Sequence, residues 1–98
     1  MVYATLRNPI LRLRGGFVTD TISFLAQQGI ATLCFDNPSR RNALGAAELD
    51  AIEHALDSLS SETRVLVVTS SEDRIFCAGA DLSQIRDGTL NGDRFQAV

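Results

Sequence analysis

The segment Phe76–Leu82, Phe-Cys-Ala-Gly-Ala-Asp-Leu, contains the residue types of this chain that are best suited to chemistry. Its consecutive small residues, Ala78, Gly79 and Ala80, let a ligand approach the main chain closely. The segment opens an expected helix, and the first N–H groups of a helix have no partner inside it. Such groups can hold an oxyanion or a phosphate. The same composition fits a tight turn that packs a strand against a helix, so both interpretations stay open at this point.

A second segment, residues 37–44 with the sequence Asn-Pro-Ser-Arg-Arg-Asn-Ala-Leu, lies between an expected strand and an expected helix. We expect it at the same end of the α/β layer as the first segment. Its basic side chains, Arg40 and Arg41, could contact a phosphate. Solvated loop charge is the alternative interpretation of both arginines.

Carboxylates, a histidine and a thiol could also serve catalysis, but each has an ordinary structural explanation. Glu72 and Asp73 fit solvated loop charges, and Asp81 fits a helix N-cap. His54 lies among carboxylates and off the apolar side of its expected helix, which predicts an exposed side chain. Cys77 has no base adjacent in sequence, which favours a packing role.

Two apolar segments at the start of the chain predict an antiparallel hairpin. Thr21–Leu25 and Ile30–Phe35 are rich in β-branched and aromatic residues, and the turn residues 27–29 separate them. The segment Asp36–Ser39 ends the second strand, because proline cannot continue a ladder of hydrogen bonds.

A helix is expected over Ala46–Leu59. Its apolar positions recur at helical spacing: Leu49, Ile52, Leu56 and Leu59. Gly45 stands at the N-cap with Glu48 three residues on, which resembles a capping box that lacks its first side chain.

Val65–Val68 is apolar at every position, which predicts a strand buried on both faces, as in a parallel sheet covered by helices. A further helix is expected from Leu82, with Asp81 as its N-cap. The order strand, strand, helix, strand, loop, helix indicates an α/β layer with a hairpin at its edge.

Composition limits the classes of function. The chain has 98 residues, which allows one domain at most, and its net charge of -3 disfavours general nucleic-acid binding. No apolar run approaches the length of a membrane span, and the two cysteines lack metal-ligand spacing. We therefore expect no nucleic-acid, membrane or metal partner.

The first twenty residues differ from the remainder. Three arginines and no acid occur up to Thr19, a pattern typical of transit peptides, although hydroxyl residues are few. We expect residues 1–20 to be a transit segment or an N-terminal extension, and residues 21–98 to form a partial domain. The expected compartment is the cytoplasm or the mitochondrial matrix.

Asn37-Pro38 and Arg41-Asn42-Ala43-Leu44, followed by Phe76–Leu82, resemble the N-terminal half of the crotonase superfamily, the enoyl-CoA hydratase/isomerase group. The spacing of the blocks and the preceding hairpin fit, and the resemblance covers about residues 22–87. It implies a fold of ββα turns that form a spiral, commonly assembled as trimers or dimers of trimers. The form Phe-Cys-Ala-Gly-Ala-Asp-Leu also resembles the methylglutaconyl-CoA hydratase branch.

The resemblance implies an acyl-CoA thioester substrate, with no metal and no cofactor besides the CoA of the substrate. The N–H of Ala80 would donate to the thioester oxygen, and the main chain of Ala78 would receive the adenine amino group. A second oxyanion N–H would come from a Gly-rich segment beyond Val98. Acyl-CoA contacts are implied for Arg41, Ala43, Leu44, Ala78, Gly79, Ala80, Asp81, Leu82 and Ser83.

The chain therefore looks like the N-terminal part of a protein that hydrates or isomerises an enoyl-CoA. No residue matches the family glutamates that move protons, so we expect the 98 residues alone to be inactive. The alternative is a truncated paralogue that binds CoA thioesters or a full-length subunit without catalysis. A product of a frameshift or a partial gene is the third hypothesis.

Overall fold

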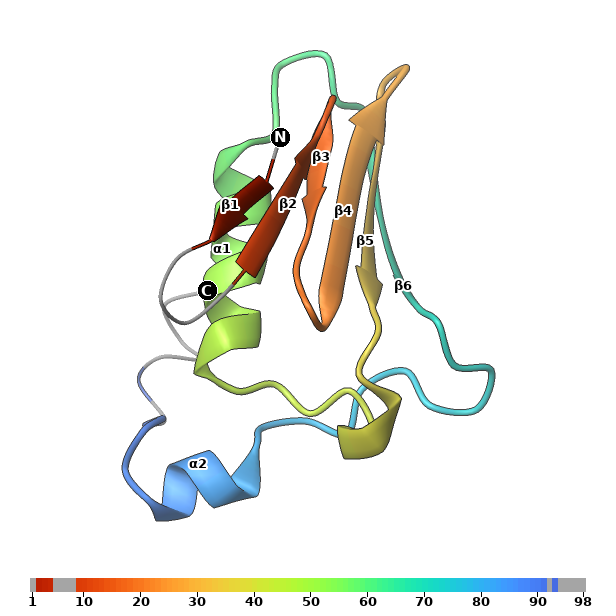
Figure 1. The fold of residues 1–98 in the computed structure, drawn as a ribbon. Helices are drawn as coiled ribbons and strands as arrows, with labels where there is room; N and C mark the ends of the chain where they lie inside the picture. The colour runs from red at the N-terminus through yellow and green to blue at the C-terminus, as the bar shows by residue number, and fades with distance from the viewer. Residues whose placement is uncertain (1, 5–8, 92, 94–98) are drawn as a thin grey trace.

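Six strands form one sheet in the described part of the chain, and they follow one another in chain order (Figure 1). The computed structural model describes residues 2–4, 9–91 and 93. The strands are β1 (Val2–Ala4), β2 (Pro9–Leu13), β3 (Gly16–Val18), β4 (Ile22–Gln27), β5 (Ile30–Phe35) and β6 (Val65–Ser70). The helices are the 3-10 turn η1 (Pro38–Arg40), α1 (Ala46–Asp57) and α2 (Leu82–Arg86). Helix α1 lies along one face of the sheet, which gives the expected α/β layers.

The predicted hairpin is confirmed. β4 and β5 pair antiparallel from Ile22 opposite Phe35 to Gln27 opposite Ile30. The two residues of the connection, Gln28 and Gly29, both have positive φ angles, 54° and 81°. Positive φ at both central positions is what a type I′ turn requires, and this turn matches the natural twist of the paired strands.

The sheet begins before the boundary that we expected at residue 21. β3 pairs antiparallel with β4, and Phe17 is only 2% exposed, with its ring centroid 5.6 Å from that of Phe24. A Cβ at Gly16 would collide with the Phe24 carbonyl oxygen, so the close approach of the two strands needs a glycine there. Residues 16–18 are thus part of the layered fold. Residues 1 and 5–8 of the expected transit segment lie outside the described residues, and its cleavage stays a prediction.

The main core lies between α1 and strands β3, β4 and β5. Its buried members are Phe17, Ile22, Phe24, Ala31, Leu33, Phe35, Ala51 and Ala55. Alternation places these strand residues on the face that α1 covers, as expected for a sheet with one buried face. The small side chains on the helix leave room for the large ones of the strands.

The predicted helix is confirmed, but its apolar stripe was partly wrong. Leu49 is 2% exposed, whereas Leu56 is 39% exposed. The buried arc of α1 is centred nearer to Ala51 and Ala55, and Leu56 lies at its edge close to the end of the helix. Alanine is only weakly hydrophobic, so the alanines at those positions did not stand out in the sequence. The four larger apolar residues of the helix therefore predicted a stripe that is rotated away from the buried arc.

His54 is not the exposed side chain that we predicted. It is half-buried, and its ring meets the edge of Phe17 with centroids 5.0 Å apart. Its Nε2 atom is buried and has no hydrogen-bond partner among the described residues. The reason is β3, which the sequence analysis did not predict. This strand places Phe17 against the side of α1 that carries His54.

β6 runs parallel to β5, but the prediction that it is buried on both faces is wrong. Val65, Leu66, Val67 and Val68 are between 36% and 49% exposed. β6 is the last strand in the sheet order, and the core under α1 contains no β6 residue.

Within the described residues, no helix is long and apolar enough to cross a bilayer.

Replacing Leu49 and Leu56 separately by alanine tests the corrected stripe. Leu49→Ala should lower the free energy of unfolding by about 2–5 kcal/mol, because it leaves a buried cavity. Leu56→Ala should change that free energy by less than about 1 kcal/mol, because much of its side chain already contacts water. Urea unfolding followed by far-UV circular dichroism measures both, and equal losses would contradict the assignment.

Candidate functional site

The two segments that the sequence singled out lie side by side. The N–H of Ala78 donates to the Arg41 carbonyl at 3.0 Å, and the N–H of Leu44 donates to the Gly79 carbonyl at 2.8 Å. The N–H of Asp81 donates to the Leu44 carbonyl at 2.9 Å, and this pattern is a parallel bridge between Leu44 and Ala80. Residues 41–44 and 78–81 therefore form one short ladder at the end of the sheet.

This ladder leaves the main chain of Ala80 free. In a parallel bridge, the central residue of one strand bonds to the two neighbours of the opposite residue. Leu44 bonds to Gly79 and Asp81, so the N–H and C=O of Ala80 itself face away from Leu44. Among the described residues, no hydrogen bond from the Ala80 N–H is recorded. An unpaired, outward N–H can serve as a hydrogen-bond donor to a ligand.

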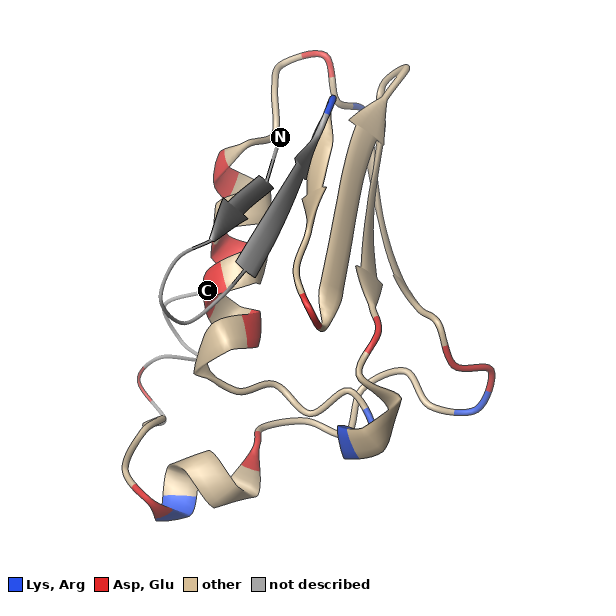
Figure 2. Cartoon of the chain, in the orientation of Figure 1, with Lys and Arg blue, Asp and Glu red and all other residues tan. Residues whose placement is uncertain are grey.

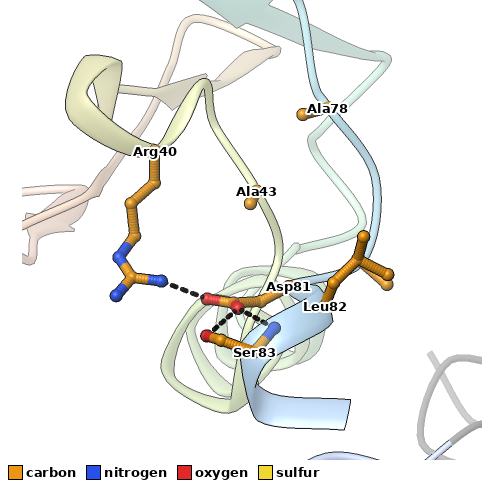
Figure 3. A pocket seen from close by; sticks show the side chains of 7 residues that line it. Arg40, Ala43, Ala78, Asp81, Leu82 and Ser83 are labelled. Atoms are coloured by element: carbon orange, nitrogen blue, oxygen red, sulfur yellow. Dashed lines mark hydrogen bonds and ion pairs between the residues drawn. The ribbon is translucent and has the colours of Figure 1, made fainter. Parts of the chain in front are cut away.

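Ala80 lines a cavity of about 440 Å³ beside the ladder (Figure 3). The lining residues are Arg40, Ala43, Ala78, Ala80, Asp81, Leu82 and Ser83. The cavity thus brings together six of the positions that the sequence implied. The other three positions, Arg41, Leu44 and Gly79, lie outside this lining, and they build the ladder through their main chains.

Arg40 spans the cavity from η1 to the start of α2, as Figure 3 shows. Its Nη1 atom lies 2.8 Å from Oδ2 of Asp81, and their side chains are 58% and 5% exposed. The sequence raised Arg40 only as a loop charge or a phosphate contact, and the ion pair across 41 residues was not predicted. The ladder between residues 41–44 and 78–81 brings these two charges close together, although they are far apart in the chain.

The N-cap role predicted for Asp81 is confirmed. Its Oδ1 accepts hydrogen bonds from the Ser83 N–H at 3.0 Å, the Gln84 N–H at 3.3 Å and the Ser83 hydroxyl at 2.6 Å. The Ser83 hydroxyl is the main cause that lowers the pKa of Asp81, helped by the Gln84 N–H and the Arg40 guanidinium, while burial opposes them. Asp81 is therefore a charged structural group at the entrance of α2.

Asn42 holds the two site segments together. This residue is 2% exposed and has a left-handed backbone with φ of 56°. Its Nδ2 donates to the Ser70 hydroxyl at 2.8 Å and to the Phe76 carbonyl at 2.9 Å. Its Oδ1 accepts the N–H of Asn37 at 2.8 Å. Sequence reasoning missed this role, although asparagine is the non-glycine residue best suited to a left-handed loop position.

Helix α2 also fixes the start of α1. The Gln84 side-chain oxygen accepts the N–H of Ala46 at 2.8 Å, and Glu48 accepts the N–H of Gly45 at 2.9 Å. The second bond is the half of the capping box that the sequence predicted. A Cβ on Gly45 would collide with the Gln84 amide. Because glycine has no side chain, the Gln84 side chain has room to cap the N-terminus of α1.

The remaining candidates stay outside the cavity. Glu72 and Asp73 do not line it, and Asp73 is exposed. The Cys77 sulfur accepts the Gly79 N–H at 3.3 Å and the side chain packs against the main core, which agrees with a packing role. Figure 2 shows acidic residues along α1, and basic residues at η1 and in the loop that follows it. By sequence, the basic residues of this region are Arg40 and Arg41. The described residues contain no group of three histidine, cysteine or acidic side chains that could hold a metal ion.

Comparison with known proteins identifies the family. A sequence model named Enoyl-CoA hydratase/isomerase matches residues 25–97. The chain belongs to this family. It is 36% identical over 81 residues to the protein named "Probable enoyl-CoA hydratase echA6" of Mycobacterium leprae, covering 78% of the chain and 29% of that protein. It is also 42% identical over 59 residues to the bovine enoyl-CoA hydratase domain-containing protein 2, mitochondrial, covering 58% of the chain and 20% of that protein.

Solved structures of the family share the fold. An enoyl-CoA hydratase of Mycobacterium tuberculosis superimposes with a TM-score of 0.61 at 32% identity, over 68% of the chain and 31% of that protein. An enoyl-CoA hydratase/carnithine racemase of Magnetospirillum magneticum superimposes with a TM-score of 0.67 over 85% of the chain and 32% of that protein, at 22% identity. The crotonase fold expected from the sequence is therefore confirmed. The chain spans about a third or less of the length of these relatives.

Replacing Asn42 by glycine tests its role in holding the site. Asn42→Gly keeps the left-handed backbone but removes the side-chain partner of the Phe76 carbonyl and of the Asn37 N–H. We expect a loss of about 1–3 kcal/mol of unfolding free energy for each group left unsatisfied, less where water replaces the side chain. Amide exchange of residues 76–81 should also accelerate.

Gln28→Gly is the matched control, because Gln28 has a nearly identical φ of 54° but an exposed side chain. It should leave the exchange of residues 76–81 unchanged. Equal behaviour of the two variants would contradict the structural role of the Asn42 carboxamide.

The lowered pKa of Asp81 predicts a pH dependence of stability. A carboxyl group whose pKa is lowered by folding stabilises the fold above its unfolded pKa, and this contribution is lost as the pH falls through the folded pKa. The chain should therefore lose stability below about pH 4. Asp81→Asn should remove this part of the slope, and Ser83→Ala should reduce it by removing the main hydrogen bond. Urea unfolding from about pH 2.5 to pH 7 measures the slope, and identical curves for all three proteins would exclude the Asp81 contribution.

Proposed function

We propose that this chain supplies the first half of an acyl-CoA site, with the Ala80 N–H as one donor of an oxyanion hole. The observation that carries the proposal is the free main chain of Ala80 at the wall of a cavity, in a chain of the enoyl-CoA hydratase/isomerase family. The thioester carbonyl oxygen would accept the Ala80 N–H. Negative charge grows on this oxygen as an enolate-like species forms, so the donor binds the transition state more strongly than the substrate.

The geometry of the loops supports a fixed donor. Ala80 is held on both sides, because Gly79 and Asp81 are bonded to Leu44. A donor that is already in place needs no reorganisation when charge develops, and removal of one such donor typically lowers the rate by about 10²–10³. In this proposal, Asp81 is a positioning residue that keeps α2 and the adjacent N–H in place.

The remaining lining gives the path for the CoA part of the ligand. The small side chains of Ala43 and Ala78 leave space beside the ladder, and the side chains of Leu82 and Ser83 would border the thioester and the pantetheine. The Ala78 carbonyl, for which no hydrogen bond among the described residues is recorded, would accept the adenine amino group. Arg40, in the lining, and Arg41, next to it in the chain, would contact the phosphates of CoA. No cofactor besides this CoA is part of the proposal.

The complete protein would add water to a 2-enoyl-CoA or move its double bond. A second oxyanion donor and the acid–base carboxylates would come from sequence outside these 98 residues, and the chain by itself should not turn over substrate. The methylglutaconyl-CoA branch, the trimeric or hexameric assembly and the cytoplasmic or mitochondrial location stay predictions. The mitochondrial label in the name of the bovine relative supports the second location.

A titration of the ¹⁵N-labelled chain with acetyl-CoA tests the proposal. We expect chemical-shift changes confined to residues 78–83 and the neighbouring 40–44 loop, with weak affinity because half of the site is present. Ala43→Glu should abolish these changes, because it fills the cavity and repels phosphate. Ala47→Glu, on the first turn of α1 and outside the cavity lining, is the matched control.

The outcomes separate binding from catalysis. Shifts that are absent, or that survive in Ala43→Glu, would overturn the assignment of the site. The purified chain should leave the enoyl absorbance of crotonyl-CoA unchanged, and measurable turnover would disprove the prediction of inactivity.

A further inference from the structure

The hydroxyl group of Ser70, the last residue of β6, has a full set of hydrogen-bond partners within the protein. It donates to the Ile75 carbonyl at 2.7 Å. It accepts the Asn42 Nδ2 group at 2.8 Å and the Glu72 N–H at 3.0 Å. A hydroxyl has one proton and two lone pairs, so these three bonds use its whole capacity. The hydroxyl therefore has one orientation that satisfies all three partners.

These bonds fold the segment that follows β6 back onto the end of the strand. Ser70 holds the N–H of Glu72, near the start of this segment, and the carbonyl of Ile75, near its end. The next carbonyl, that of Phe76, accepts Asn42 Nδ2 at 2.9 Å. Two consecutive carbonyl groups thus have side-chain partners, and these two partners are bonded to each other. The chain therefore enters the ladder with both of these carbonyl groups held.

The Ser70 hydroxyl is connected to the cavity through the main chain. The residues that line the cavity do not include Ser70. The ladder begins where the N–H of Ala78, two residues after Phe76, donates to the Arg41 carbonyl. Arg41 directly precedes Asn42 in the chain. Both segments of the ladder thus start within two residues of a group that belongs to the Ser70 hydrogen-bond cluster.

We propose that Ser70 is a positioning residue for the Ala80 N–H, because its hydroxyl holds the segment that leads into the ladder. The inference rests on the proposed function, in which this N–H donates to a thioester oxygen. A displacement of about 1 Å, even one caused away from the reacting atoms, can lower a rate by about 10². The Ser70 hydroxyl thus serves the site without touching the ligand.

A positioning role and a general role in stability predict different results. The core under α1 does not include Ser70, and β6 pairs with Phe35 of β5 at this position through the main chain. Loss of the hydroxyl should therefore loosen the ladder more than the core. Amide exchange distinguishes the two cases, because it measures the local opening of a segment separately from global unfolding.

Amide exchange of Ser70→Ala, followed by NMR, tests the positioning role. The substitution adds no atom and removes the side-chain partner of the Ile75 carbonyl. The N–H groups of Ala78 and Asp81, which are bonded within the ladder, should exchange about tenfold faster. The amides of the central strand β5 should keep their exchange rates.

Two further comparisons assign the effect to this hydroxyl. Ser71→Ala is the matched control, since the Ser71 hydroxyl donates to Asp36 at 2.8 Å in an exposed bond, and it should leave these exchange rates unchanged. Ser70→Thr keeps a hydroxyl and should restore slow exchange. Ser70→Val has nearly the same shape as threonine but no hydroxyl, so it should behave like Ser70→Ala.

Titration of the ¹⁵N-labelled variants with acetyl-CoA measures the effect on the site. The dissociation constant, obtained from the shift of the Ala80 amide, should rise by about threefold or more in Ser70→Ala, because the binding-competent arrangement is less populated. It should stay near the original value in Ser71→Ala and Ser70→Thr. Far-UV circular dichroism confirms that each variant is folded, so a change in this constant reports on the site.

The outcomes distinguish this inference from the proposed function. Absent shifts in the unmodified chain would overturn the proposed function, and the role of Ser70 toward its donor with it. Binding that is present in the unmodified chain and equally strong in Ser70→Ala would overturn the inference alone. Equal acceleration of the β5 amides would make Ser70 a general stabilising residue. A Ser70→Thr variant that matches Ser70→Val would exclude the hydroxyl as the cause.

Discussion

The buried carboxamide of Asn42 is the interaction on which the site depends. It connects the loop after β5 to the end of β6 and to the loop before α2, across 28 and 34 residues of the chain. Every polar atom of this side chain has a protein partner in the interior, where an unpaired polar group is costly. The carboxamide therefore favours one arrangement of the loops, the one in which the ladder between residues 41–44 and 78–81 is formed.

The ladder between residues 41–44 and 78–81 sets the direction of the main-chain groups beside the cavity. Leu44 uses both of its main-chain groups on the neighbours of Ala80, which turns the Ala80 N–H away from Leu44. The Arg40–Asp81 pair and the caps at the two helices then hold the surrounding elements. In the proposed site the donor is a main-chain N–H, so its direction does not depend on a rotamer, and this suits a donor that must be in place before charge develops.

β6 shows that a continuous apolar strand is not always buried by the elements next to it. A continuous apolar strand indicates burial on both faces, and family relatives about three times as long have more chain to supply a cover. Within the described residues, the four apolar side chains of β6 are between 36% and 49% exposed. The β6 sequence thus carries information about contacts that extend beyond the core under α1.

The sequence alone determined the local elements and the family. Periodicity and turn residues located β4, β5 and α1 nearly to their ends, because these signals act over a few residues. Two motifs in register indicated the crotonase fold. The tertiary structure alone decided the burial of His54, the inclusion of β3, the exposure of β6 and the contacts of Arg40 and Asn42. These features join residues distant in the chain, and no local pattern specifies which distant groups will meet or which face will remain uncovered.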